Sequence, residues 1–124
     1  MKERGSPTIR ILFGRTFSMG PGKVALLERI DQTGSISAAA REMSMSYRRA
    51  WLLVDSMNHA FRSAVVETAA GGQGGGGARV TALGKDLLVR YREIEEKAAA
   101  CVAGELAELQ DLLAESPELT KEGS

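Results

Sequence analysis

The sequence contains very few of the residues that build metal sites, disulfides and membrane spans. Its 124 residues include one cysteine, Cys101, and one histidine, His59. They cannot form an internal disulfide or supply the clustered ligands of a zinc site. No run of about 18 apolar residues is present, so we expect no transmembrane helix. The basic N-terminus lacks the apolar segment of a secretory signal. We therefore expect a cytoplasmic protein with no metal site.

Catalytic motifs are also missing. The sequence has no G-x-S-x-G and no H-E-x-x-H motif. A Walker phosphate-binding loop would require serine or threonine after Gly84-Lys85, where Asp86 stands, and glycine where Arg79 stands. The carboxylates Glu93, Glu95 and Glu96 fall on a polar helical face, which is typical of a solvated surface. We therefore do not expect an enzyme.

The charged residues are distributed unevenly along the chain. Apolar residues make up 44% and charged residues 26%, as in a folded domain, and the net charge is zero. Residues 1–62, however, carry ten basic and five acidic side chains, a net charge of +5, whereas residues 63–124 carry −5. This split indicates that the first half of the chain meets a polyanion, and the alternative explanation is a chance imbalance.

The first half has the signals of one strand and three helices. Residues 1–8 form a polar tail, 9–13 read as a strand, and 14–22 read as a loop whose Pro21 suits the start of a helix. A helical apolar period starts at Lys23 and ends at Gly34, and Ser35 can cap a short helix that ends at Met43. After the link 44–46, Ser46 can cap a third helix over 47–61, with an apolar stripe formed by Ala50, Val54, Met57 and Phe61.

A glycine-rich hairpin is predicted next. Residues 65–68 and 79–81 have strand composition, and the loop of 69–78 between them contains six glycines and Gln73. A nucleotide-binding glycine loop would lie between a strand and a helix, so this one is better explained as the wing of a DNA-binding domain. Thr81 can cap the last helix, and Gly84 allows close packing in its first turn.

The last predicted helix runs over residues 82–115 and is long for so small a domain. Its 34 residues would span about 50 Å, more than the domain can cover, so we expect it to pair with a second chain. The alternative is a helix folded back on its own domain, with a break near Gly104. Residues 116–124 are expected to be a frayed tail. The predicted dimerisation residues are Leu87, Tyr91, Ile94, Ala98, Val102, Leu106 and Leu109.

These elements predict a mainly α fold with a small β-hairpin. Residues 9–81 would form a winged helix-turn-helix that binds DNA, followed by a long C-terminal dimerisation helix over 82–115. The third helix would place its first turn in the major groove, where arginine can bond guanine. For Trp51, the alternatives are partial burial and contact with the groove. For the two arginines of the first turn, the alternative to DNA binding is a helix face that is simply exposed to solvent. The candidate DNA-binding residues are Ser35, Ser37, Ser46, Tyr47, Arg48, Arg49, Trp51, Gln73 and Arg79.

Two segments of the sequence resemble a known family. Residues 34–40 (GSISAAA) and 46–51 (SYRRAW) are similar to the helix-turn-helix of ModE-type molybdate-responsive transcription regulators. The serine- and alanine-rich motif alone is shared with LysR-type regulators. The glycine loop of 71–78, followed by Val80, Thr81 and Gly84, is similar to the ModE-type wing and linking helix. The resemblance covers about residues 9–114.

The resemblance implies a homodimer that binds double-stranded DNA at a palindromic operator under the control of molybdate or tungstate. In full-length members, separate C-terminal domains bind the oxyanion. Only 43 residues follow Thr81 here, so we expect the molybdate-binding domain to be absent and therefore expect no cofactor. We predict a sequence-specific transcriptional regulator linked to molybdenum metabolism. The alternative is an interaction subunit that pairs through its long helix with a full-length regulator.

Overall fold

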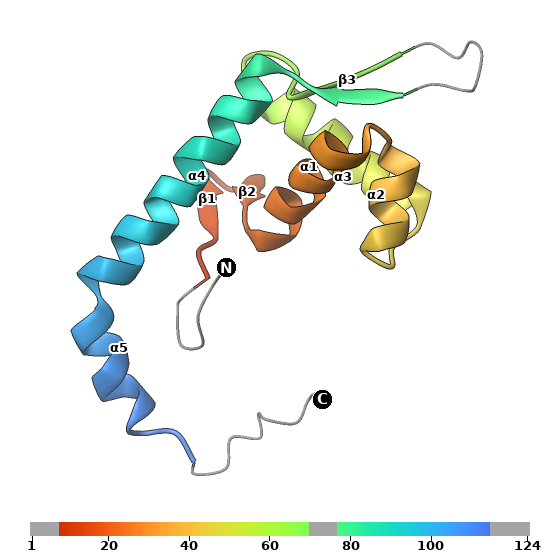
Figure 1. Cartoon of the computed structure of the whole chain (residues 1–124). Coiled ribbons are helices and arrows are strands. Elements are labelled where there is room, and N and C mark those ends of the chain that lie inside the picture. The colour runs from red at the N-terminus through yellow and green to blue at the C-terminus, as the bar shows by residue number, and fades with distance from the viewer. Residues whose placement is uncertain (1–7, 70–76, 115–124) are drawn as a thin grey trace.

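The computed structural model describes residues 8–69 and 77–114, and these residues form five helices and two small antiparallel sheets (Figure 1). Three helices form a compact group, one β-hairpin lies on each side of it, and the last two helices extend away from it. The elements in chain order are β1 (Ile11–Phe13), β2 (Phe17–Met19), α1 (Pro21–Thr33), α2 (Ile36–Glu42), α3 (Tyr47–Ala60), β3 (Val66–Thr68), β4 (Ala78–Val80), α4 (Ala82–Cys101) and α5 (Ala103–Gln110).

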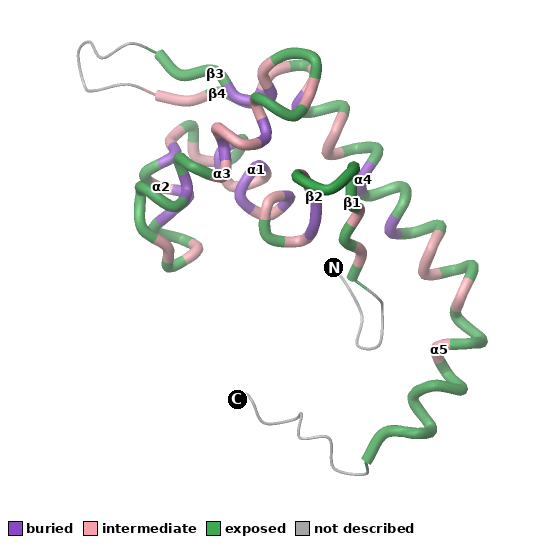
Figure 2. The backbone as a smooth tube through the Cα atoms, turned by 180° about the vertical axis from the view of Figure 1, so that it is seen from behind, coloured by how far each residue is buried: buried purple, intermediate pink, exposed green. Residues whose placement is uncertain are grey.

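The core lies between the first three helices and is closed by the strands. Helix α1 buries Val24, Leu26, Leu27 and Ile30, and it starts at Pro21 as predicted, because proline at the first helical position loses no helical hydrogen bond. It ends at Gly34, whose φ of 73° lies in the left-handed region that glycine adopts at little cost. Figure 2 shows the buried backbone concentrated in this group, whereas the last two helices are mostly exposed.

The predicted loop over 14–22 was partly wrong, because it contains a strand. Residues 17–19 pair with β1 in antiparallel register, with Phe13 opposite Phe17 and Ile11 opposite Met19. Gly14, with φ at 70°, lies in the turn between the strands. The alternation of Phe17, Ser18 and Met19 is a two-residue period, but it spans three residues and is too short to stand out between glycines.

The predicted glycine-loop hairpin is confirmed where the structure describes it. Strands β3 and β4 are antiparallel, with Val66 opposite Val80 and Glu67 opposite Arg79. The backbone N–H of Ala69 also donates to the carbonyl of Gly77 at 2.9 Å, so pairing continues beyond the strands. The predicted loop position Gln73 lies outside the described residues, as do 1–7 of the N-terminal tail and the C-terminal tail over 116–124.

The predicted single helix over 82–115 is two helices. Helix α4 ends at Cys101 and α5 begins at Ala103, because Val102 has a non-helical ψ of 15°. Val102 is β-branched and Gly104 has no side chain, and both residue types have low helix propensity. Figures 1 and 2 agree that α5 lies away from the helical core, so the described chain does not fold back on itself.

The first half of α4 packs on its own domain. The Tyr91 side chain is buried, and its hydroxyl donates to the carbonyl of Ile9, just before β1. Arg92 bonds Glu28 of α1 at 2.7 Å and Glu95 of its own helix at 2.7 Å, and these carboxylates raise its pKa. Nowhere in the described ranges is a helix both long and apolar enough to cross a membrane.

Candidate nucleic-acid interface

Helices α2 and α3 are joined by a short turn whose geometry follows from two serine caps. The Ser35 hydroxyl accepts the Ala38 N–H at 3.0 Å and starts α2, and the Ser46 hydroxyl accepts the Arg49 N–H at 3.1 Å and starts α3. Both caps were predicted from the sequence. Between the helices, Ser44 has a φ of 57°, and the half-buried Met43 and Met45 pack against the core. The turn therefore fixes where the first turn of α3 lies.

The first turn of α3 presents cationic and aromatic side chains to solvent. Tyr47 is 55% exposed, and Arg48 and Arg49 are both exposed. Within the described ranges, neither arginine has an ion-pair partner. On the opposite side of the helix, Ala50, Val54 and Met57 are buried. Burial of one face therefore forces the predicted face of α3 outward.

The two arginines border a shallow depression of about 240 Å³ with an apolar floor. Its lining consists of Ser46, Arg48, Arg49, Leu52 and Leu53. Guanidinium groups beside exposed aliphatic surface can bond planar acceptors while the floor contacts methyl groups. Trp51 does not line this depression and is 43% exposed, so more than half of its surface is covered by the protein.

The serine hydroxyls differ in what they still offer a ligand. The lone pairs of Ser35 and Ser46 are partly used by the capping N–H groups, although each O–H remains able to donate. Ser37 is exposed on the first turn of α2. Donors of this kind suit phosphate oxygens. Of the predicted residues, Ser46, Arg48 and Arg49 line one depression, whereas Ser35 and Ser37 are not part of its lining.

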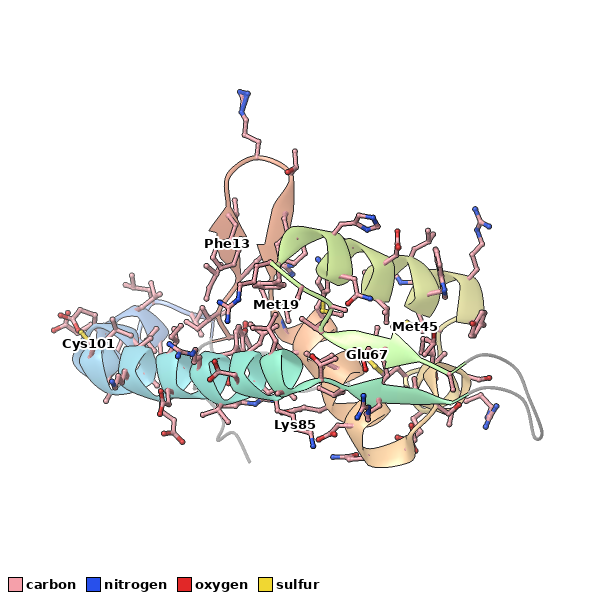
Figure 3. All side chains as sticks on the ribbon, turned by 90° about the horizontal axis from the view of Figure 1, so that it is seen from above. Phe13, Met19, Met45, Glu67, Lys85 and Cys101 are labelled. Atoms are coloured by element: carbon pink, nitrogen blue, oxygen red, sulfur yellow. The ribbon has the colours of Figure 1, made fainter. Side chains whose placement is uncertain are left out.

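The β3–β4 hairpin carries one predicted residue in a different situation. The Arg79 guanidinium bonds the Glu67 carboxylate directly across the strands at 2.5 Å (labelled Glu67 in Figure 3). Both side chains are more than half exposed. Arg79 is thus held along the hairpin, and an incoming anion has to compete with Glu67 for it. The alternation pattern alone gave no signal of this pair, because register depends on the loop.

A backbone bond holds the hairpin close to the start of α2. The N–H of Ala78 donates to the carbonyl of Gly34 at 2.9 Å. A hollow of about 360 Å³ lies at this junction, lined by Gly34, Glu67, Thr68, Ala69, Gly77, Ala78 and Arg79. Glycine at position 77 permits the approach, since a Cβ there would lie 3.3 Å from the Gly34 oxygen.

Asn58 is a positioning residue that the sequence did not reveal. Its Oδ1 accepts the N–H groups of Val65 at 2.8 Å and Val66 at 3.2 Å, and its Nδ2 donates to the Val66 carbonyl at 3.0 Å. A single amide thereby fastens β3 to the C-terminal part of α3. One asparagine in a helix carries no local signal of such a contact, because its partners lie seven and eight residues away.

The predicted dimerisation residues separate into two groups. Tyr91 is buried in its own domain, and the partly buried Leu87 packs against the same core, so both side chains have partners within one chain. Ile94 and Leu109 are 44% and 56% exposed, and Ala98, Val102 and Leu106 are partly exposed. The exposed apolar face therefore starts near Ile94. In the described part of the chain, no three His, Cys, Asp or Glu side chains are grouped to hold a metal ion.

Three curated relatives illustrate what the chain is similar to. It is 51% identical over 77 residues to the molybdenum-pterin-binding protein MopB of Rhodobacter capsulatus, which covers 62% of this chain and 28% of MopB. It is 39% identical over 97 residues to the transcriptional regulator ModE of Yersinia pestis, covering 76% of this chain and 37% of that protein. It is 40% identical over 81 residues to the DNA-binding transcriptional dual regulator ModE of Escherichia coli K12, covering 63% and 31%.

Each match covers only a minor part of the relative's own length. The chain spans about 28–37% of the length of these three curated proteins. No protein-family model matches it.

Proposed function

We propose that this chain, a homologue of the ModE, MopA and MopB molybdate-responsive regulators over about 60% of its length, is a DNA-binding transcriptional regulator linked to molybdenum. Residues 9–81 act as a winged helix-turn-helix in which α3 is the reading helix and the β3–β4 hairpin is the wing. The observation that carries this proposal is the exposed first turn of α3, with Tyr47, Arg48 and Arg49 turned away from a buried face.

Side-chain chemistry indicates which of these residues contact bases and which contact phosphates. Arg48 and Arg49 lie at the start of α3, where a helix in the major groove meets base edges. A guanidinium group bonds the two acceptors of guanine together, which discriminates that base by about 1–3 kcal/mol. The hydroxyls of Ser35, Ser37 and Ser46 donate to phosphates and fix the orientation of the domain.

Replacing Arg48 with alanine is expected to relax sequence preference by about 1–3 kcal/mol at one base pair of each half-site. The fold is unaffected, because the side chain is exposed and has no ion-pair partner within the described ranges. Affinities for a panel of operator variants measure the effect, and Arg62→Ala is the control because Arg62 is exposed beyond the end of α3. An unchanged preference would remove Arg48 from base reading.

Arg79 is expected to act as a phosphate contact that Glu67 restrains. Arg79→Ala weakens binding to all duplexes alike and lowers the salt slope by about one unit. Glu67→Gln releases Arg79 and removes a negative charge, so it strengthens binding to all duplexes by about 0.5–1 kcal/mol, the scale of an exposed ion pair. Glu93→Gln, which alters an exposed carboxylate on α4, is the control. A change confined to one base pair would identify Arg79 as a base reader.

The exposed face of α4 and α5 supports a homodimer on a palindromic operator. Ile94 of α4 and, beyond the break at Val102, Leu106 and Leu109 of α5 are partly or largely exposed, and exposed leucines continue to Leu113. Two-fold symmetry in the protein matches two-fold symmetry in the operator, with half-sites read by the two α3 helices. Sedimentation equilibrium of the whole chain measures this association.

Fluorescence anisotropy tests the proposed function directly. The whole chain is titrated into palindromic and scrambled duplexes at two salt concentrations, with and without molybdate. We expect tight, sequence-selective and salt-dependent binding that molybdate leaves unchanged in these 124 residues. Binding altered by molybdate would locate an oxyanion site in this chain. Failure to bind any duplex would overturn the proposal.

A second function is favoured by the same exposed helical face. The leucines of α5 can pair with the equivalent helix of a longer regulator, and the chain would then act as an interaction subunit. In that case the purified chain forms no specific complex with DNA, yet it forms a heterodimer when a longer regulator of the same type is added.

A further inference from the structure

The β1–β2 hairpin carries a cationic hollow on the side of the molecule away from the wing. The hollow measures about 310 Å³, and its lining includes Arg10, Arg15 and Lys23 but no acidic residue. Burial, and secondarily the charge of Arg10, lower the pKa of the Lys23 amino group. That amino group donates to the Ser18 carbonyl at 2.9 Å and lies 5.0 Å above the Phe17 ring. Positive charge is therefore gathered here without a neighbouring carboxylate in the lining.

The same hairpin exposes an apolar side chain beside these cations. The Phe13 ring packs against Phe61 of α3, with ring centroids 6.4 Å apart (labelled Phe13 in Figure 3). Neighbouring side chains of a strand point to opposite faces, so Leu12 points away from this aromatic contact. Leu12 is 69% exposed and lines the hollow. The surface thus combines cations with an unburied aliphatic group.

Segment 103–114, which contains α5, has the complementary character. It carries Glu105, Glu108 and Asp111 and no basic residue. Leu109, Leu112 and Leu113 are 56%, 80% and 60% exposed. Within one chain, Figures 1 and 2 both place α5 far from the β1–β2 hairpin. An acidic segment with exposed leucines and a basic hollow with an exposed leucine are therefore both without a partner in the same described chain.

The hollow is set back from the first turn of α3. The hairpin contacts Phe61, just after α3, and the hollow reaches Ser56 of α3, which lies seven residues after Arg49 and eight after Arg48. That offset is about 10–12 Å along the helix axis. The DNA backbone offers no apolar group to cover the exposed Leu12, whereas the leucine side chains of a helix can cover it.

In the homodimer of the proposed function, a two-fold pairing of the two α4 helices brings the two surfaces together. Ala98, Ala99 and Ala100 near the end of α4 allow two helices to cross closely. An antiparallel crossing there sets the α5 of one chain beside the first half of α4 in the other. In that half, Tyr91 bonds Ile9, the residue that leads into β1. The α5 helix therefore arrives next to the β1–β2 hairpin of the second chain.

We propose that segment 103–114 of each chain docks into the cationic hollow of the β1–β2 hairpin of a second copy, reciprocally. The inference rests on the homodimer of the proposed function and names the surfaces that complete it. Glu105, Glu108 and Asp111 meet Arg10, Arg15 and Lys23, and the exposed leucines cover Leu12. Each dimer contains this contact twice, and it is weakened by salt.

Charge reversal with mixing tests the proposal. Arg15→Glu and Glu108→Arg are each expected to weaken self-association about tenfold or more, because both copies of the contact become repulsive. In an equimolar mixture, each contact of the heterodimer again pairs opposite charges, so affinity returns towards that of the wild type. Arg41→Glu, a reversal on the exposed surface of α2, replaces Arg15→Glu in the control mixture, where the heterodimer keeps one native contact and one repulsive contact and therefore binds more weakly than the Arg15→Glu·Glu108→Arg heterodimer. Sedimentation equilibrium provides the dissociation constants.

The outcomes separate this inference from the dimer on which it rests. Weakening by both variants with rescue on mixing supports it. A wild-type chain that stays monomeric overturns the homodimer and this contact together. A wild-type dimer that neither variant weakens overturns this contact and leaves pairing through the helices intact. Loss of DNA affinity by Arg15→Glu with unchanged dimerisation also overturns it and assigns the hollow to phosphate binding.

Discussion

Replacing Asn58 with alanine is expected to lower the free energy of unfolding by about 3 kcal/mol, because three hydrogen bonds lose their common partner. The Asn58 amide bonds the N–H groups of Val65 and Val66 and the carbonyl of Val66. Both valines are buried, with exposed fractions of 0% and 2%, so water cannot readily replace the amide. Urea denaturation measures the change, and it is done at one fixed protein concentration because the proposed dimer would make stability depend on concentration.

Two further variants identify the cause of the loss. Asn58→Asp keeps the acceptor for both N–H groups but sets a carboxylate oxygen against the Val66 carbonyl, so it is expected to recover part of the stability. His59→Ala changes the exposed neighbour on the same helix and is expected to cost less than about 0.5 kcal/mol. If Asn58→Ala unfolded at the same urea concentration as His59→Ala, the amide would have no structural role.

The features that the sequence predicted correctly are those with local causes. Ser35, Ser46 and Thr81 each accept an N–H three residues ahead, and a hydroxyl at that spacing is the signal by which helix starts are recognised. Gly34 ends α1 because it adopts a positive φ. The stripe of Ala50, Val54 and Met57 identified the buried face of α3, and it thereby fixed Arg48 and Arg49 on the exposed face.

The features that were missed depend on contacts between distant residues. Strand β2 exists because it pairs with β1 and because Phe17 packs against Phe61, 44 positions later in the chain. Tyr91 points into its own domain and bonds Ile9, 82 residues earlier in the chain. The apolar residues in this part of α4 therefore pack within the same chain. The Arg79–Glu67 pair requires the register of β3 and β4. Periodicity reports that a face is apolar, and it does not report which surface covers it.

Segment 64–66 links the end of α3 to the start of α4 and is held from both sides. Asn58 bonds it from α3, and from α4 the Thr81 N–H donates to the Val65 carbonyl at 2.9 Å while the Thr81 hydroxyl donates to the Ala64 carbonyl at 2.8 Å. In the proposed regulator, α3 reads DNA and α4 leads into the dimer contact. This segment therefore sets the angle between the DNA-reading helix α3 and helix α4. The close packing of α4 on this segment, at Gly84, is the basis of the second prediction.

Substituting alanine for Gly84 is expected to destabilise the protein by about 2 kcal/mol. A Cβ at this position would lie 2.5 Å from the Val65 carbonyl oxygen and 2.7 Å from Val80 Cγ1. The first of these atoms belongs to the backbone, so the overlap is relieved only by moving α4 away from segment 64–66. Overpacking costs about 1–3 kcal/mol, and the 2.5 Å approach to a backbone atom places Gly84→Ala at the upper end of that range. After the gain of about 1 kcal/mol in helix propensity from glycine to alanine, a net loss of about 2 kcal/mol remains.

Gly104 gives the matched control, because it differs from Gly84 only in its surroundings. It also lies in a helix, α5, but a Cβ there would meet no atom within 4 Å. Gly104→Ala is therefore expected to raise stability by up to about 1 kcal/mol, the opposite sign to Gly84→Ala. Urea denaturation of the two variants under identical conditions measures both. Equal and stabilising effects would show that α4 does not approach Val65 as closely as the structure places it, and the clamp on segment 64–66 would then rest on Asn58 and Thr81 alone.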